Sequence, residues 1–169
     1  QKANIRALKN NVTTDDVFQM IDEIKNDVDI PMVFMTYLNV LFKYGSDRFL
    51  TRAKEVGICG VIIPDLPYEE KGELQSVAKN YGIEVVSLIA PTSEERIKMI
   101  AADAEGFVYA VSSLGVTGVR NEIKTDLESI TAAVKEATDI PVAIGFGIST
   151  PEQAKKYAAV SDGVIVGSA

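Results

Sequence analysis

Two hydrophobic patterns alternate along the chain. Six short runs are apolar and β-branched at consecutive positions, which is typical of strands that are covered on both faces. Between these runs, apolar residues recur every three or four positions, so each stretch would form a helix with one buried side. The predicted strands are 30–37, 59–66, 84–90, 106–112, 141–147 and 162–169.

Side chains that cap helices precede most of the predicted helical stretches. Ser, Thr and Asp at such positions accept hydrogen bonds from the free N–H groups of the first turn. Thr150 is followed by Pro151, and proline is favoured at the first helical position. Gly57 is expected to end one helix in the left-handed conformation. The predicted N-caps are Thr13, Ser46, Ser93, Thr125 and Thr150.

The spacing of the strands predicts a parallel sheet. Successive strands start 21 to 35 residues apart, which leaves room for a helix in each right-handed crossover. An open doubly wound sheet needs only six strands, whereas a (β/α)8 barrel needs eight and about 250 residues. The chain begins in a predicted helix over 1–9 with no strand before it, and it stops directly after a strand. We therefore expect one α/β domain over 1–169, a TIM barrel incomplete at both ends that holds about strands three to eight.

Composition narrows the possible chemistry. The chain has 24 acidic and 17 basic residues, and this net charge of −7 argues against binding to nucleic acid. It has no histidine and one cysteine, Cys59, which excludes imidazole catalysis and Cys/His zinc sites. Cys59 is expected to be a small buried residue. No apolar run approaches the roughly 20 residues of a membrane span, so a cytoplasmic protein without a membrane segment is expected.

Glycines follow the last two predicted strands. Gly145 and Gly147 end one strand, and Gly167 with Ser168 ends the next. In barrels, the loops after the last two strands commonly bind phosphate through backbone N–H groups, and glycine permits that close approach. A helix N-terminus after the loop would add positive potential. The glycines could instead only turn the chain, but two such motifs in succession favour a phosphate site.

Other candidate residues lie at the ends of earlier strands. The connection 112–125 is long and contains two glycines, which suggests either a lid over the substrate or a surface insertion. Asp65 lies between two prolines and is either a base or orienting group or, as we favour, a loop cap. Tyr37 and Asn39 could line a cavity. The charged segment 69–73 is expected to be the solvated first turn of a helix.

Five motifs in order resemble the α subunit family of tryptophan synthases over essentially the whole chain. The first two are Thr-Tyr-Leu-Asn at 36–39 and Pro-Asp-Leu-Pro-Tyr-Glu-Glu at 64–70. The next are Ser-Leu-Gly-Val-Thr-Gly at 113–118 and Gly-Phe-Gly-Ile-Ser at 145–149. The last, Gly-Ser-Ala at 167–169, is shared with many phosphate-binding barrels.

The resemblance implies a (β/α)8 lyase that cleaves indole-3-glycerol phosphate into indole and glyceraldehyde-3-phosphate. It implies a catalytic Glu and Asp upstream of residue 1, so no catalytic residue is assigned in this chain. Tyr109 and Thr117 would support that pair, and Phe146 would lie against the indole with Tyr37 nearby. The residues implied to hold the phosphate are Gly118, Gly147, Gly167 and Ser168.

The resemblance also implies a partner, a β subunit in a heterotetramer of two α and two β chains. Pyridoxal phosphate would belong to that partner, so no cofactor and no metal are expected in this chain. Two alternatives remain at this point. The chain could belong to another phosphate-binding barrel enzyme of histidine, tryptophan or thiamine biosynthesis, or it could be a catalytically inactive barrel fragment.

Overall fold

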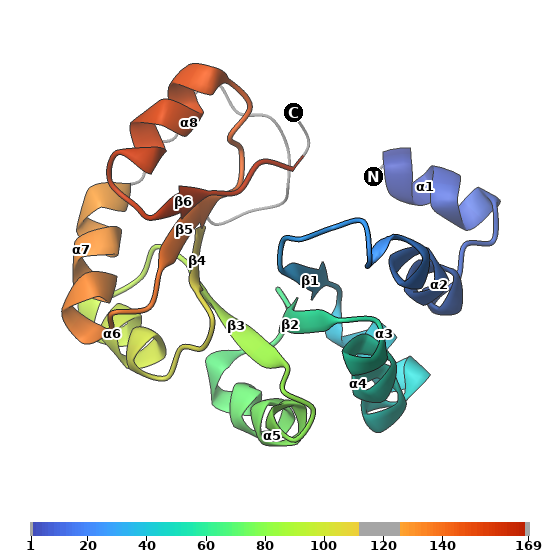
Figure 1. Cartoon of the computed structure of the whole chain (residues 1–169). Coiled ribbons are helices and arrows are strands. Elements are labelled where there is room, and N and C mark those ends of the chain that lie inside the picture. Colours follow the sequence, from blue (N-terminus) through green and yellow to red (C-terminus); the bar gives the residue numbers. More distant parts are fainter. Residues whose placement is uncertain (1, 112–125, 168–169) are drawn as a thin grey trace.

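The computed structural model describes residues 2–111 and 126–167, which form a curved parallel sheet with helices on its outer side (Figure 1). The strands follow one another across the sheet in chain order, and every neighbouring pair is parallel. The sheet thus has no point where strand order reverses, which is the arrangement of a barrel wall. The strands are β1 (Met32–Met35), β2 (Ile58–Ile62), β3 (Glu84–Ile89), β4 (Val108–Val111), β5 (Val142–Gly145) and β6 (Gly163–Val164).

Helices connect the strands and cover the convex face of the sheet, while the second helix lies beside β1 and the first lies beyond the second (Figure 1). Most of them agree with the hydrophobic pattern, but the short α3 directly after β1 was not predicted. The helices are α1 (Lys2–Lys9), α2 (Thr14–Ile24), α3 (Leu38–Tyr44), α4 (Ser46–Glu55), α5 (Tyr68–Lys79), α6 (Glu94–Ala102), α7 (Leu127–Ala137) and α8 (Pro151–Ala158).

Apolar side chains are buried on both faces of the sheet. Two large clusters lie between the sheet and the helices, one around Phe18 and Leu50 and the other around Val134 and Ile144. A smaller cluster lies on the inner face and includes Tyr109. The strands therefore have apolar residues on both faces, as their continuous hydrophobic runs predicted.

The caps confirm most of the predicted helix starts. Thr13 and Thr150 each form a capping box, and Ser93 accepts a hydrogen bond from the backbone of Arg96. Ser46 was wrong as an N-cap, because it is the first helical residue of α4 and Gly45 takes the cap position. Thr125 lies outside the described residues, and Asp126 caps α7.

The charged segment 69–73 is exposed at the start of α5, as predicted, except at Lys71. Lys71 is only 4% exposed, because its side chain extends from α5 toward β3. Its Nζ donates to Ser87 Oγ at 2.9 Å and to the Asp103 carbonyl at 2.8 Å. The burial of this ammonium group is possible because these two acceptors replace its water and the Asp103 carboxylate lies 3.6 Å from Nζ.

Among the described residues, every helix is too short or too polar to cross a membrane.

Candidate functional site

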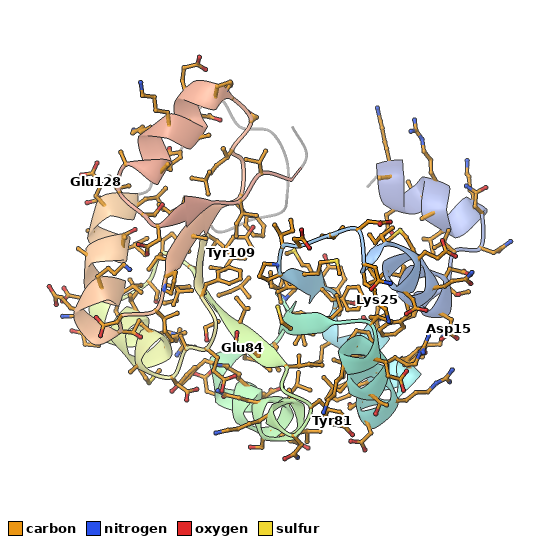
Figure 2. The ribbon with its side chains drawn as sticks, in the orientation of Figure 1. Asp15, Lys25, Tyr81, Glu84, Tyr109 and Glu128 are labelled. Carbon is orange, nitrogen blue, oxygen red and sulfur yellow. The ribbon has the colours of Figure 1, made fainter. Side chains whose placement is uncertain are left out.

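The inner face of the sheet carries an aromatic pair near the carboxyl ends of β4 and β5. Tyr109 is 4% exposed and belongs to the inner cluster (Figure 2). The Phe146 ring centroid lies 5.6 Å from that of Tyr109, with 49° between the ring planes. Burial raises the pKa of the Tyr109 hydroxyl, so at neutral pH this group is a hydrogen-bond donor and not a base.

Gly145 makes room for this arrangement. A Cβ built on Gly145 would lie 2.4 Å from Cε2 and 2.5 Å from the hydroxyl oxygen of Tyr109. The register pairs Tyr109 with Ala143 and Val111 with Gly145. The Tyr109 ring therefore leans along β5 toward its carboxyl end, and its hydroxyl reaches the level at which β5 ends.

The chain turns sharply directly after β5. Phe146 and Gly147 have successive positive φ angles of 71° and 83°. Glycine adopts this conformation readily, whereas a bulky residue such as phenylalanine does so rarely and at a cost of about 1–3 kcal/mol. The turn places the Phe146 ring against Tyr109, so this ring contact helps to hold the left-handed backbone.

The start of α8 is closed by its own side chains. Gln153 Oε1 accepts hydrogen bonds from the N–H groups of Ser149 at 2.8 Å and Thr150 at 3.2 Å. Thr150 Oγ1 in turn accepts from the N–H of Gln153. These three N–H groups already have partners, and the contribution of this helix N-terminus to phosphate binding through its positive potential stays a prediction.

Two glycines follow neighbouring strands at the same edge of the sheet. β5 pairs with β6 through Ala143 and Gly163, and the N–H of Ile165 donates to the carbonyl of Ile144 at 2.8 Å. Gly147 and Gly167 come directly after this paired region. Gly167 is exposed, and nothing lies within 4 Å of a Cβ built on it.

Several predicted site residues lie outside the described residues. These are Thr117, Gly118 and Ser168.

Tyr37 lies at the carboxyl end of β1, and two strands, β2 and β3, separate β1 from β4. Its side chain is 62% exposed, and it occupies the N-cap position of α3. Asn39, which was expected at the strand end, lies in the first turn of α3. The structure therefore places Tyr37 at the same edge of the sheet as the Tyr109–Phe146 pair, on a more distant strand.

Asp65 has the role of a cap. Its Oδ1 accepts a hydrogen bond from the N–H of Leu38 at 2.9 Å, across 27 residues of sequence. Sequence reasoning favoured a cap but did not identify the partner, because Leu38 is distant in the chain. Cys59 is partly buried, and its Sγ donates to the Met32 carbonyl at 3.3 Å.

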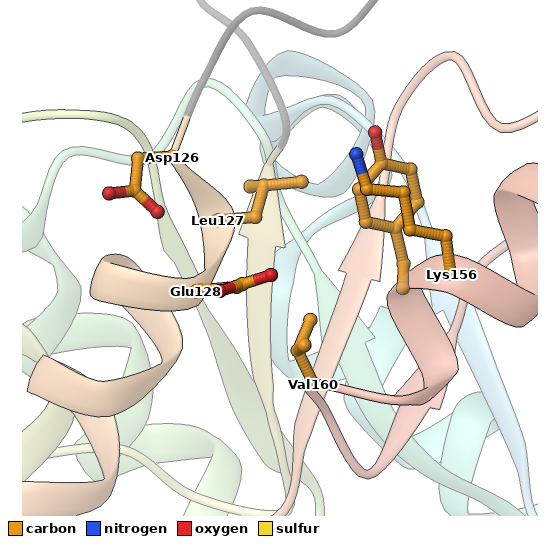
Figure 3. Close-up of a pocket in the computed structure, with 6 residues that line it drawn as sticks. Asp126, Leu127, Glu128, Lys156 and Val160 are labelled. Atoms are coloured by element: carbon orange, nitrogen blue, oxygen red, sulfur yellow. The ribbon is translucent and has the colours of Figure 1, made fainter.

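Two hollows open in the helical layer. One, of about 260 Å³, lies between α7 and α8 and is lined by Asp126, Glu128 and Lys156 among others (Figure 3). The other, of about 400 Å³, lies between α6 and α7 and also borders Asp126. Both are separated by the sheet from the Tyr109–Phe146 pair. Over residues 2–111 and 126–167, no group of three or more Cys, Asp and Glu side chains could hold a metal ion.

Comparison with known proteins gives a consistent result. A sequence profile described as tryptophan synthase alpha chain matches residues 1–169. The tryptophan synthase alpha chain of Lacticaseibacillus casei is 48% identical over 169 residues, and that of a Thermoanaerobacter species is 50% identical. Each alignment covers 100% of this chain and 64% of the relative, so the chain spans slightly under two thirds of their length.

Structure comparison extends the agreement to the fold. The tryptophan synthase subunit alpha of Campylobacter jejuni superposes with a TM-score of 0.84 at 35% identity, over 95% of this chain and 64% of that structure. The fold, the glycines after β5 and β6 and the sequence matches all point to the same family. The chain therefore belongs to the tryptophan synthase alpha chain family.

Proposed function

We propose that the protein carrying this chain is the α subunit of tryptophan synthase, a lyase that cleaves indole-3-glycerol phosphate into indole and glyceraldehyde-3-phosphate. One structural observation supports the proposal in addition to family membership. The Tyr109–Phe146 pair and the glycines after β5 and β6 gather at the same edge of the sheet. An aromatic wall beside open backbone N–H groups suits a substrate with an indole ring at one end and a phosphate at the other.

The aromatic pair would contact the indole end. Ring faces and edges at 5–6 Å from one another are the usual geometry of aromatic contacts, so an indole could extend the pair formed by Tyr109 and Phe146. Tyr37, at the end of β1, would approach the same ring from across the inner face. The neutral Tyr109 hydroxyl would donate a hydrogen bond to a catalytic carboxylate and hold its orientation.

The glycines would hold the phosphate. Gly167 is exposed with nothing within 4 Å of an added Cβ, Gly147 turns the chain with a positive φ, and the family resemblance adds Gly118 and Ser168. Phosphate binding far from the reacting bond would supply energy that positions the indole end. Thr117 would contribute from the segment that resembles the family's closing loop.

The reaction itself needs an acid and a base. Release of indole requires a proton at the ring carbon and removal of a proton from the glycerol hydroxyl. The family resemblance assigns these tasks to a Glu and an Asp upstream of residue 1. Asp65 does not substitute for them, since its carboxylate already accepts the N–H of Leu38.

The partner follows from the same family membership. Indole would pass to a β subunit in an assembly of two α and two β chains, and pyridoxal phosphate would be bound by that partner. This chain would then need no cofactor of its own. A cytoplasmic location stays a prediction.

The decisive experiment measures indole release from indole-3-glycerol phosphate by a chain of the relatives' full length that contains these residues. Gly147→Val should weaken binding of glycerol phosphate by at least tenfold, or about 1.4 kcal/mol. Gly72→Ala, in an open position on α5, is the matched control and should bind normally. Absence of indole release, or turnover of another phosphate ester only, would favour a different phosphate-binding barrel enzyme.

A further inference from the structure

We propose that Asp65 is a positioning residue for the strand-end site. Its carboxylate extends the pairing of β1 with β2 beyond the end of β2 and thereby fixes the backbone around Tyr37. The anchoring stands on the geometry alone, whereas its effect on substrate binding rests on the proposed function.

The hydrogen bonds along β1 show the extension. β1 pairs with β2 up to Met35 and Ile62, and the N–H of Thr36 then donates to the Ile62 carbonyl at 3.0 Å. In a parallel pair, alternate residues of one strand direct their N–H groups to the same neighbour. Leu38 is therefore the next donor toward β2, and its N–H meets Asp65 Oδ1 at 2.9 Å.

A side chain is needed at this point because the backbone of β2 turns away. Leu66 donates to the Ile63 carbonyl, which closes a tight turn around Pro64 and Asp65. Leu38 begins α3, so its N–H has no acceptor within the helix. The N-cap residue Tyr37 supplies no side-chain acceptor, and Asp65 fills that role from the neighbouring loop.

These hydrogen bonds fix the backbone on both sides of Tyr37. Of the residues on either side of it, Thr36 is bonded to the last residue of β2, and Leu38 is bonded to Asp65 in the segment that follows. Its own side chain is 62% exposed. These two backbone bonds, together with the bond from the Val40 N–H to the Tyr37 carbonyl, restrain the backbone from which the Tyr37 ring extends.

The test uses Asp65→Asn and Asp65→Ala in the full-length protein. The amide of Asn retains an oxygen that can accept from Leu38, whereas Ala has none. Asp65→Ala should raise KM for indole-3-glycerol phosphate about fivefold, as expected for one lost hydrogen bond of about 1 kcal/mol. In Asp65→Ala, kcat should change less than KM, and Asp65→Asn should restore the native KM. Asp29→Ala, an exposed carboxylate before β1, is the matched control.

Two kinetic results would overturn the positioning role. If Asp65→Asn lost kcat as severely as Asp65→Ala and shifted the pH profile, the carboxylate would be acting as an acid or base. If both variants kept the native KM and lost only thermal stability, the bond would be structural alone.

Amide hydrogen exchange separates this proposal from the proposed function. Exchange at Leu38 should become faster in Asp65→Ala and stay native in Asp65→Asn, whatever substrate the protein uses. Unchanged exchange at Leu38 in Asp65→Ala would overturn the anchoring. The expected exchange pattern in a protein that releases no indole would support the anchoring and overturn the proposed function.

Discussion

The ring of Tyr109 occupies the space that a side chain at Gly145 would need, since a Cβ there would lie 2.4 Å from the ring carbon Cε2. Tyr109 is buried on the inner face, so the ring cannot swing into solvent to relieve a clash. The two positions therefore depend on each other, and this dependence can be measured.

Gly145→Ala is expected to lower the free energy of unfolding by about 1–3 kcal/mol through overpacking. Tyr109→Leu shortens the opposing side chain, so the cost of Gly145→Ala should be smaller in that background. Urea denaturation of the two single variants and the double variant gives the coupling. Additive effects would show that the ring and residue 145 are independent.

Gly72→Ala should have the opposite effect. Gly72 lies within α5 with nothing within 4 Å of an added Cβ, so alanine meets no clash there. Replacing a helical glycine in open space should raise the free energy of unfolding by about 0.5–1 kcal/mol. A decrease in the same denaturation assay would contradict the placement of residue 72 in an open helical position.

Lys71→Met is expected to lower the free energy of unfolding by about 2–4 kcal/mol, because it leaves one buried and one partly buried acceptor without their donor. The acceptors are Ser87 Oγ and the Asp103 carbonyl. Adding Ser87→Ala should recover part of the loss. Lys79→Met, an exposed lysine on the same helix, is the control and should have little effect in the same denaturation assay.

The carboxylate of Asp162 should make stability depend on pH in the acid range. The hydrogen bond from Lys135 and then that from the Val142 N–H lower the pKa of Asp162 below its usual 3.8. A carboxyl whose native pKa is lowered stabilises the fold above its unfolded pKa, and the contribution is lost as the pH falls through the native value.

The difference in unfolding free energy between the native protein and Asp162→Asn should therefore be largest at neutral pH and shrink below about pH 4. Asn can still accept from Val142, so the difference reports the charge. In a Lys135→Met background the pH dependence should weaken. A difference that grows on acidification would contradict this assignment.

A polypeptide of residues 1–169 alone is expected to release no indole. At the strand ends described, the carboxylate of Asp65 is engaged by Leu38, and the family's acid and base are expected upstream of residue 1. The comparison is an indole assay of this polypeptide beside the full-length protein, with circular dichroism to check folding. Activity within tenfold of the full-length protein would place the catalytic pair inside these residues.

The hydrophobic pattern predicted the six strands and their parallel order because each strand is covered on both faces. It overestimated the last strand, predicted over 162–169 and observed as Gly163–Val164. It missed α3, whose first N–H is capped by Asp65 from another loop. No local pattern records a cap 27 residues away.

The candidate site was predictable where one short motif contains the signal. The glycines at 145 and 147 are such a motif. The close approach of the Tyr109 ring to Gly145 and the positive φ of Gly147 were visible only in the structure. The burial of Lys71 was not predictable, because its acceptors lie on β3 and after α6. Roles that depend on such distant partners require the folded chain.

The bonds of Gln153 have a consequence for ligand binding itself. Its amide oxygen satisfies the N–H groups of Ser149 and Thr150 before any ligand arrives. The turn from β5 into α8 is thus preorganised, and a phosphate bound at Gly147, as proposed, would not have to order it. Little conformational entropy is then lost at this turn on binding, so more of the interaction free energy remains as affinity.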